Sequence, residues 1–281
     1  MRRAAMPDIT NFLYKTLPGR LLVYPLTRRP FSKICGTFMD SPLSKFMIKP
    51  FIRANGIDMS EYPDRSYKSF NDFFCRSIKP QLRPVDMDPG HLIAPCDGLL
   101  SAWKINQDLV LSVKQCRYTL TSLLKNGPLA RQYRDGMCLV FRLCVNNYHR
   151  YVYADSGQKS RNVFIPGVLH TVRPAALEEI SVFRENCREY TIIRSRTFDD
   201  IIQMEVGAML VGRIVNHMQK GKAERGQEKG YFEYGGSTII LLLKKDQADI
   251  LPEILKNSEQ GIETPVKLGQ MIGSHTVNPG S

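Results

Sequence analysis

After Gly90 the chain is a succession of short apolar runs, rich in β-branched and aromatic residues, with turn residues between them. Runs of this length and spacing predict antiparallel strands rather than helices. Residues 239–243 are apolar without interruption, which predicts a strand buried on both of its faces. The other predicted strands are residues 109–113, 137–145, 163–165, 190–193 and 201–215, and a short helix is predicted over residues 119–124.

The part of the chain before Gly90 has a helical pattern in short pieces. Ser41-Pro42 predicts the start of a helix over residues 43–52, and Asn71 predicts the N-cap of another that ends at Phe74. Proline and glycine residues are expected to divide the helical part before residue 43 into shorter pieces. The expected breaks are Pro18-Gly19, Pro25 and Pro30.

Together these patterns predict an α+β fold, in which a small helical N-terminal region packs on a mostly antiparallel β body. Residues 80–90 contain three prolines and are typical of a connector. The predicted division is therefore a helical, basic, membrane-associating region at residues 1–80 and a β-rich catalytic domain at residues 81–281.

The positive charge is concentrated at the beginning of the chain. Of the net charge of +12, residues 1–50 contribute +7, from nine basic and two acidic residues. Aromatic and leucine side chains alternate with these charges, a combination that suits an anionic membrane surface. Nucleic acid also attracts basic segments, but no known nucleic-acid-binding motif accompanies them, and a solvated basic face is the plainest alternative.

No run approaches the roughly 18 to 20 apolar residues that span a bilayer, and no signal-peptide core is recognisable. The expected location is therefore the cytoplasm or the cytoplasmic face of a membrane. Seven cysteines without a CxxC pair indicate buried, reduced thiols. Five histidines at no metal-ligand spacing predict no metal site.

The segment around Gly236-Ser237 has a specific chemical capability, although a Gly-Gly-Ser-Thr string is by itself typical of a turn. The serine oxygen can attack the preceding carbonyl, and glycine leaves the approach open and tolerates the strained backbone. The resulting ester can eliminate to dehydroalanine and then give a pyruvoyl group. A base must take the serine proton, and a carboxylate commonly orients such a base.

Two other segments carry groups of that kind. Asp97-Gly98 supplies a carboxylate, although Asp-Gly is also a common turn. Tyr148-His149-Arg150 supplies an imidazole, although a lone histidine near a strand end is more often structural.

These three segments occur in the order and approximate spacing of the phosphatidylserine decarboxylase family, which the chain resembles over about residues 30–275. Further segments that resemble the family's motifs are Phe70-Asn71-Asp72-Phe73-Phe74-Cys75-Arg76, Lys79-Pro80, Arg83-Pro84, Val113-Lys114, Tyr118-Thr119-Leu120, Pro166-Gly167-Val168-Leu169, Val206-Gly207-Ala208, Val211-Gly212 and Lys229-Gly230-Tyr231-Phe232.

The resemblance implies cleavage between Gly236 and Ser237, with Ser237 becoming a covalent pyruvoyl cofactor. It implies that Asp97 belongs to the charge-relay set for self-cleavage and that His149 serves the decarboxylation step. The implied reaction is the conversion of phosphatidylserine to phosphatidylethanolamine. The implied setting is a homodimer of αβ units bound peripherally to the cytoplasmic face of a membrane, the cell membrane in a bacterium.

The chain departs from the family's Asp-Tyr-His-Arg-x-His motif at two positions. Asn147 replaces the acid, and Val152 replaces the second histidine, which would be the base for serine activation. Three explanations are open. His149 serves both steps, His170 supplies the missing imidazole, or the chain matures slowly or not at all.

Other functions stay open at this point. The same chemistry on a soluble amino acid is one alternative, and an unprocessed, non-enzymatic membrane-binding relative is another. A serine hydrolase is disfavoured because no Gly-x-Ser-x-Gly elbow surrounds Ser237.

Overall fold

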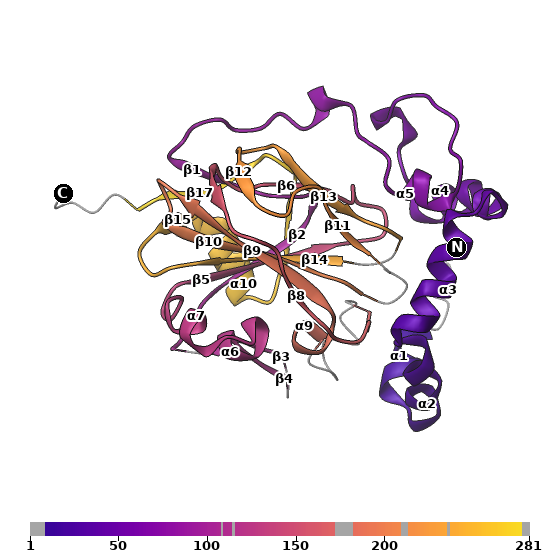
Figure 1. Cartoon of the computed structure of the whole chain (residues 1–281), viewed down its shortest axis with the longest axis horizontal. Helices are drawn as coiled ribbons and strands as arrows, with labels where there is room; N and C mark the ends of the chain where they lie inside the picture. The colour runs from indigo at the N-terminus through magenta and orange to yellow at the C-terminus, as the bar shows by residue number, and fades with distance from the viewer. Residues whose placement is uncertain are drawn as a thin grey trace.

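A nine-stranded antiparallel sheet forms the centre of the protein in a computed structural model that describes residues 9–107, 109–113, 116–171, 182–208, 213–234 and 237–276 (Figure 1). Its strands follow the order β12-β7-β9-β10-β14-β5-β2-β16, and β8 pairs with β9 beside this path. In that order they are β12 (Gly221–Ala223), β7 (Gly157–Lys159), β9 (Arg188–Ser195), β10 (Asp200–Val206), β14 (Ser237–Leu243), β5 (Met137–Leu143), β2 (Gly98–Lys104), β16 (Thr264–Val266) and β8 (Val163–Ile165).

The strand predicted to be buried on both faces is β14, and its place in the sheet explains its composition. It pairs with β10 on one side and β5 on the other, and every side chain from Ser237 to Leu243 is buried. A strand in this position has no solvent face, so an uninterrupted apolar run is the pattern it requires.

Three smaller groups of strands complete the β body. They are the sheets β1 (His91–Ile93), β17 (Met271–His275), β15 (Ala248–Ile250) and β11 (Ile214–Asn216), β13 (Glu228–Phe232), β6 (Arg150–Val152), and the hairpin β3 (Leu109–Val113), β4 (Cys116–Thr119). A fully buried ion pair, 2.6 Å between Lys229 Nζ and Glu205 Oε2, joins β13 to β10 of the large sheet. Lys229 Nζ also donates a hydrogen bond to Asn216 Oδ1 at 2.7 Å, and a buried charge needs such additional partners.

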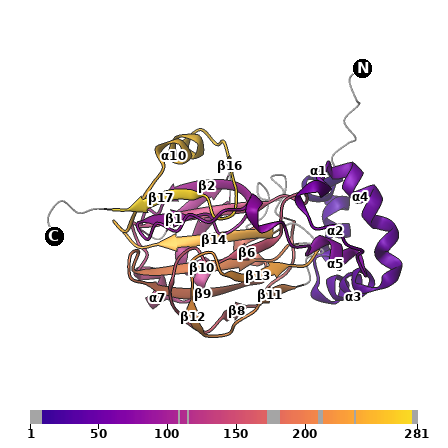
Figure 2. The same ribbon diagram turned by 90° about the horizontal axis from the view of Figure 1, so that it is seen from above.

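Short helices cover the β body. The helix α10 (Pro252–Glu259) lies against β2 and β16, while α6 (Leu120–Leu124), α7 (Gly127–Arg131) and α9 (Val182–Glu185) lie on other sides of it (Figures 1 and 2). The predicted helix over residues 119–124 is α6, and Thr119 and Ser122 form a capping box at its start.

The N-terminal helices gather at one end of the β body (Figure 2). They are α1 (Ile9–Lys15), α2 (Leu17–Leu26), α3 (Arg29–Asp40), η1 (Pro42–Met47), α4 (Ile48–Asn55), η2 (Met59–Glu61), α5 (Phe70–Phe74) and η3 (Pro80–Leu82). The predicted α+β fold with a small helical N-terminal region is therefore confirmed. The two predicted regions share one apolar cluster, since Phe74 and Ile57 pack together with Val152 and Leu268.

Three local predictions in this region were wrong. Pro25 lies inside α2 rather than breaking it, one residue from its end. The predicted helix at 43–52 is a 3₁₀ turn followed by α4. Ser69, and not Asn71, caps α5, because the Ser69 hydroxyl accepts the Asp72 N–H at 3.1 Å. Asn71 lies inside the helix, and its side-chain amide is hydrogen-bonded to Tyr234 N and to Asp40.

Six cysteines of the described part are free, four of them buried. Within the same residues no helix is long and apolar enough to cross a bilayer, and no group of three or more His, Cys, Asp or Glu side chains is arranged to hold a metal.

Candidate active site

Ser237 begins the central strand β14 and is completely buried. Its Oγ has no hydrogen-bond partner among the described residues. Such an orphaned hydroxyl is unusual in a folded interior, where buried polar atoms are nearly always paired. Gly236, the other half of the predicted cleavage site, lies outside the described residues.

The sheet register shows what lies beside Ser237. Ile239 is opposite Glu205, which is opposite Glu189 on β9. Because side chains alternate along strands, the row two residues on, Ser237 with Gly207 and Cys187, is directed to the same face. The hydrogen bond from Gly207 N to Cys187 O, 3.0 Å, shows that these two residues continue the pairing of β10 with β9.

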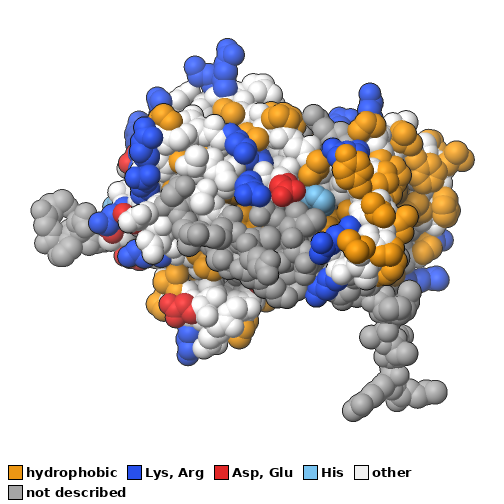
Figure 3. Space-filling view, turned by 90° about the horizontal axis from the view of Figure 1, so that it is seen from below, with side chains coloured by type: hydrophobic (Ala, Val, Ile, Leu, Met, Phe, Trp, Pro, Cys, Tyr) orange, Lys and Arg blue, Asp and Glu red, His pale blue; other side chains and the backbone are white. Residues whose placement is uncertain are grey.

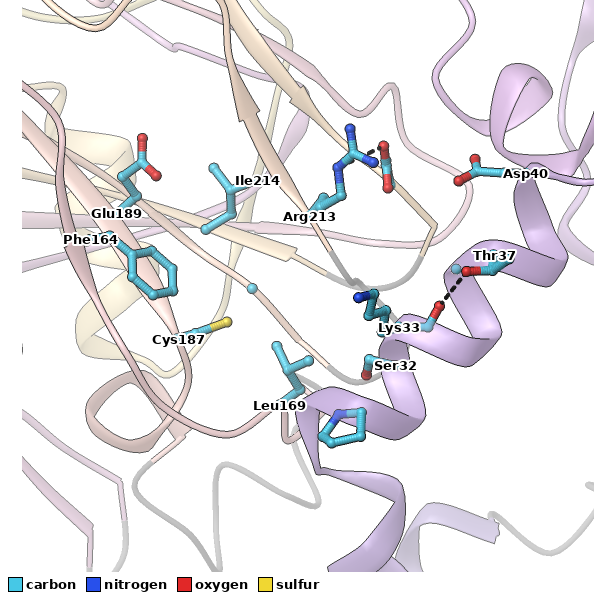
Figure 4. A pocket seen from close by; sticks show the side chains of 14 residues that line it. Ser32, Lys33, Thr37, Asp40, Phe164, Leu169, Cys187, Glu189, Arg213 and Ile214 are labelled. Carbon is cyan, nitrogen blue, oxygen red and sulfur yellow. Dashed lines mark hydrogen bonds and ion pairs between the residues drawn. The ribbon is translucent and has the colours of Figure 1, made fainter.

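A cavity of about 680 Å³ opens beside this row, between α3 and the ends of the strands (Figure 4). Gly207 and Cys187 line it, together with Phe164, Leu169 and Ile214. Its position next to Ser237 makes it the natural place for a substrate.

The cavity also contains charges of both signs from two parts of the chain. Lys33 and Asp40 come from α3, and Arg213 and Glu233 come from the β body, where they form an ion pair of 3.5 Å (Figure 4). Burial raises the pKa of Glu233, and Asp40 adds to this shift while Arg213 opposes it. Glu189 supplies a further carboxylate, which Asn216 fixes by donating a hydrogen bond of 2.7 Å.

His149 is also completely buried, and its protonation state follows from its contacts. The Nδ1 atom lies 2.9 Å from the carbonyl oxygen of Asn147, which can only accept, so Nδ1 carries the proton. Burial lowers the pKa of His149 to about 3, so the ring is neutral near pH 7. The Nε2 atom is therefore an unprotonated base, and it has no hydrogen-bond partner in the described structure.

The fold brings His149 and Ser237 to the same end of the sheet. Ser237 pairs with Leu143 at the end of β5, and the loop that follows β5 leads directly to His149. On the other side, His149 O accepts the N–H of Phe232, five residues before Ser237. Since both side-chain atoms are unpaired, Nε2 and Oγ are not hydrogen-bonded to one another in this conformation.

Asp97 is held by Arg83 rather than by a histidine. Two hydrogen bonds of 2.8 and 2.6 Å join its carboxylate to the buried guanidinium, and a third comes from Leu268 N at 2.9 Å. The hydrogen bonds to Asp97 raise the pKa of Arg83. Asp97 and the segment that leads to His149 line one pocket, with Asn147 and Tyr148 in its wall.

Val152 explains why no imidazole reaches Asp97. Its N–H donates to Pro95 O at 2.8 Å, two residues before Asp97, and its side chain packs in the same cluster as Leu268. A histidine at position 152 would therefore lie beside the Asp97 segment. In this chain that place is apolar, and Asp97 is neutralised by Arg83 alone.

His170 lies in a different environment. Its Nδ1 is 3.4 Å from the Tyr14 hydroxyl, and its Nε2 is 3.8 Å from Glu185. Burial, and to a lesser degree Arg28, lowers the pKa of His170 to about 4. Its backbone is linked through Asn186 to Gly207 O, and the described partners of its ring are Tyr14 and Glu185 rather than Ser237.

The sequence did not identify the charged lining of the cavity. Lys33 is one of nine basic residues in the first fifty, and the sequence pattern does not distinguish it from the others. The pattern also gave no functional prediction for Arg213 or Glu233. One signal was available, because Glu233 lies four residues before Ser237 and next to a motif segment. The contribution of α3 had no signal, since its residues are about two hundred positions away in the chain.

Known proteins resemble this chain over nearly its whole length. The sequence profile described as phosphatidylserine decarboxylase matches residues 70–274. Phosphatidylserine decarboxylase proenzyme 2 of Clostridium acetobutylicum is 44% identical over 94% of this chain and 90% of its own length. The proenzymes of Clostridium botulinum and Clostridium perfringens are 43% and 41% identical, over 98% and 94% of this chain and 95% and 92% of their own lengths. The extent of these matches, together with the buried serine beside a cavity, shows that the chain belongs to the phosphatidylserine decarboxylase family.

Proposed function

We propose that this protein decarboxylates phosphatidylserine to phosphatidylethanolamine after cleaving itself between Gly236 and Ser237. The relatives are named as proenzymes of this activity. The observation that carries the proposal is the Ser237 hydroxyl, which is buried and has no hydrogen-bond partner among the described residues. Gly207 and Cys187, on the strands beside it, line a cavity with charges of both signs.

Self-cleavage needs a base for the Ser237 hydroxyl, and we assign this role to His149. Its neutral Nε2 accepts the proton, and Oγ attacks the Gly236 carbonyl, so that the peptide bond becomes an ester. Loss of the Ser237 Cα proton then breaks the Cβ–O bond. Gly236 leaves as a carboxylate, and the dehydroalanine left behind takes up water and releases ammonia to give the pyruvoyl group.

The residues present fit such a group, because Ser237 begins a strand held on both sides, and its Oγ is buried without a described hydrogen-bond partner. The group would supply an electrophilic carbonyl for the substrate amine and an electron sink for the breaking carbon–carboxylate bond. Lys33 and Arg213 suit the phosphate and carboxylate of the headgroup, and Glu189 suits its ammonium. His149 Nε2 then takes up a proton from solvent and passes it to the carbon that has lost the carboxylate.

The helical end of the molecule supports docking on an anionic membrane. Hydrophobic side chains gather there with Lys and Arg among them (Figure 3). The most exposed are Leu17, Leu21, Leu22, Tyr24, Ile34, Leu43 and Phe46. Apolar side chains among cations suit insertion between anionic headgroups. Since α3 also lines the cavity, this face would bring the lipid headgroup to the site.

Intact mass spectrometry under denaturing conditions tests the proposal first. We expect two chains, residues 1–236 and residues 237–281, with the smaller blocked by a pyruvoyl group. Phosphatidylserine in mixed micelles should then be converted to phosphatidylethanolamine, and Ser237→Ala should abolish both cleavage and turnover. A single uncleaved chain after long incubation would favour an unprocessed membrane-binding relative instead.

The substrate and the assembly have tests of their own. Turnover of free amino acids with none of phosphatidylserine would favour the soluble-substrate alternative. A homodimer of αβ units is the assembly that we propose, and light scattering of the detergent-solubilised protein would measure it.

A further inference from the structure

The helix α5 contacts His149, the proposed base, and Tyr234, three residues before Ser237. It is one turn long, and Ser69 caps its start. Phe70 N donates to the buried hydroxyl of Ser44 at 2.8 Å, which fixes the helix against η1. Four of the five residues of α5 are buried, so the helix is a rigid support rather than a surface element.

Asn71 connects this helix to the chain just before the cleavage site. Its Oδ1 accepts the N–H of Tyr234 at 3.2 Å, three residues before Ser237. Its Nδ2 donates to Asp40 Oδ1 at 2.9 Å. An N–H can only donate and a carboxylate only accepts, so these two partners determine which way the amide is turned.

Phe74, on the same helix, supports the base. Its ring centroid lies 4.2 Å from that of His149 and 5.2 Å from that of Tyr234. The Tyr234 ring in turn packs edge-on against Phe70, with centroids 4.9 Å apart. One short helix therefore contacts both the imidazole and Tyr234, which precedes the proposed cleavage site.

We propose that Asn71 is a positioning residue for self-cleavage, which holds the backbone at Tyr234, three residues before Ser237. The inference rests on the proposed cleavage at Gly236–Ser237. The attack requires the reacting atoms to approach within about 3 to 3.5 Å, and small displacements of either one slow such reactions strongly. Asp40 is the second anchor, because it fixes the orientation of the Asn71 amide.

The rate of self-cleavage tests this role independently of decarboxylase activity. Freshly translated full-length chain is followed over time by intact mass, as it converts to residues 1–236 and 237–281. Asn71→Ala removes both hydrogen bonds and should slow cleavage by about ten- to a hundred-fold, the range expected for a misplaced reacting group.

A reciprocal exchange distinguishes positioning from general damage. Asn71→Asp keeps an acceptor for Tyr234 N–H but sets a carboxylate against Asp40, so it should slow cleavage. Adding Asp40→Asn to Asn71→Asp allows the amide at position 40 to donate to the carboxylate at position 71. This double variant should recover cleavage to within about three-fold of the parent, since the pair is restored at unchanged net charge.

Asn126→Ala is the matched control. It removes side-chain hydrogen bonds in another part of the protein, one accepted from Leu129 N at 3.1 Å at the start of α7 and one with Tyr190. It should leave the cleavage rate unchanged. Thermal unfolding of each variant, measured with Ser237→Ala added so that no chain is cut, shows whether stability has been lost.

Parental cleavage by Asn71→Ala would overturn the inference, and so would a double variant that regains thermal stability but not cleavage. If the parent chain itself never cleaves, the proposed function fails first, and that result is visible before any variant is made.

Discussion

At the residue scale, the buried imidazole of His149 makes a prediction about acid stability. Its folded-state pKa of about 3 lies below the ordinary value of 6.5. Above pH 6.5 the shift contributes nothing. As the pH falls below 6.5, His149 becomes protonated in the unfolded chain but stays neutral in the folded chain. The free energy of unfolding therefore falls, by roughly 2 kcal/mol at pH 5.

His149→Gln removes this titration. In the uncleavable Ser237→Ala background, its free energy of unfolding should fall less between pH 7 and pH 5 than that of the parent. Urea unfolding at the two pH values measures the difference. An equal loss in both proteins would mean that the folded-state pKa of His149 is not lowered, and would contradict the burial that we assign to its ring.

Replacing Asp97 can abolish activity by destabilising the fold, even if Asp97 takes no direct part in the reaction. Its carboxylate neutralises the buried guanidinium of Arg83. Asp97→Asn would leave that buried cation with Glu61 at 3.6 Å as its remaining described carboxylate, so we expect a loss of up to about 3 to 5 kcal/mol in the free energy of unfolding. Combining it with Arg83→Met should restore much of the loss, because no unpaired charge remains.

Urea unfolding in the Ser237→Ala background measures both Asp97 variants, and the cleavage rate is then compared separately. A double variant that is stable but still uncleaved would support a direct part for Asp97 in the charge relay. If Asp97→Asn alone is as stable as the parent, the Asp97–Arg83 ion pair contributes little to the free energy of unfolding.

The start of helix α5 shows a limit of prediction from sequence. Ser69 and Asn71 are both good N-cap residues, and local preference cannot choose between them. The choice depends on Tyr234 and Asp40, which come from distant parts of the chain and occupy the Asn71 amide. Ser237, His149 and Asp97 were named through the resemblance to a family, and their roles stay predictions.

At the element scale, the pattern of apolar runs was a good guide to the strands, since the predicted residues 109–113 and 163–165 are β3 and β8. β14 was predicted because its apolar run follows from its central place. In β13, Lys229 is fully buried only because Glu205, on a strand of another sheet, pairs with it. A charged residue in a sequence gives no sign that such a partner exists.

The helix α2 provides a prediction about membrane docking. Leu17 and Leu21 are 78% and 77% exposed, one turn apart on its outer face. Replacing both by Ser should weaken binding to phosphatidylserine-containing vesicles by at least about ten-fold, since each buried leucine contributes on the order of 1 kcal/mol or more. Vesicle co-sedimentation measures the change.

Met87 and Ile262 give a matched control for that experiment, because both are exposed apolar residues of the β body. Replacing these two by Ser should leave vesicle binding unchanged. Equal losses in the two double variants would show that the helical end is not the docking surface.

At the scale of the whole molecule, cleavage would divide the chain but not the fold. The piece after the cut contains β14 in the middle of the large sheet, β16 at its edge, β15 and β17 of another sheet, and α10. β14 is hydrogen-bonded to β10 and β5, which belong to the other piece, and its side chains are buried. The two pieces should therefore remain together under native conditions, and separate only when the whole protein unfolds.

Refolding should then distinguish cut from uncut protein. The two pieces of the cut protein must find one another from solution, so its refolding yield should fall as the protein is diluted. The uncut Ser237→Ala chain keeps β14 covalently tied to its neighbours, and its yield should not depend on concentration in this way. Dilution from urea over a range of protein concentrations, followed by size-exclusion chromatography, measures both. A small piece that separates in native buffer would mean that the central strand is held far less firmly than its pairing and burial indicate.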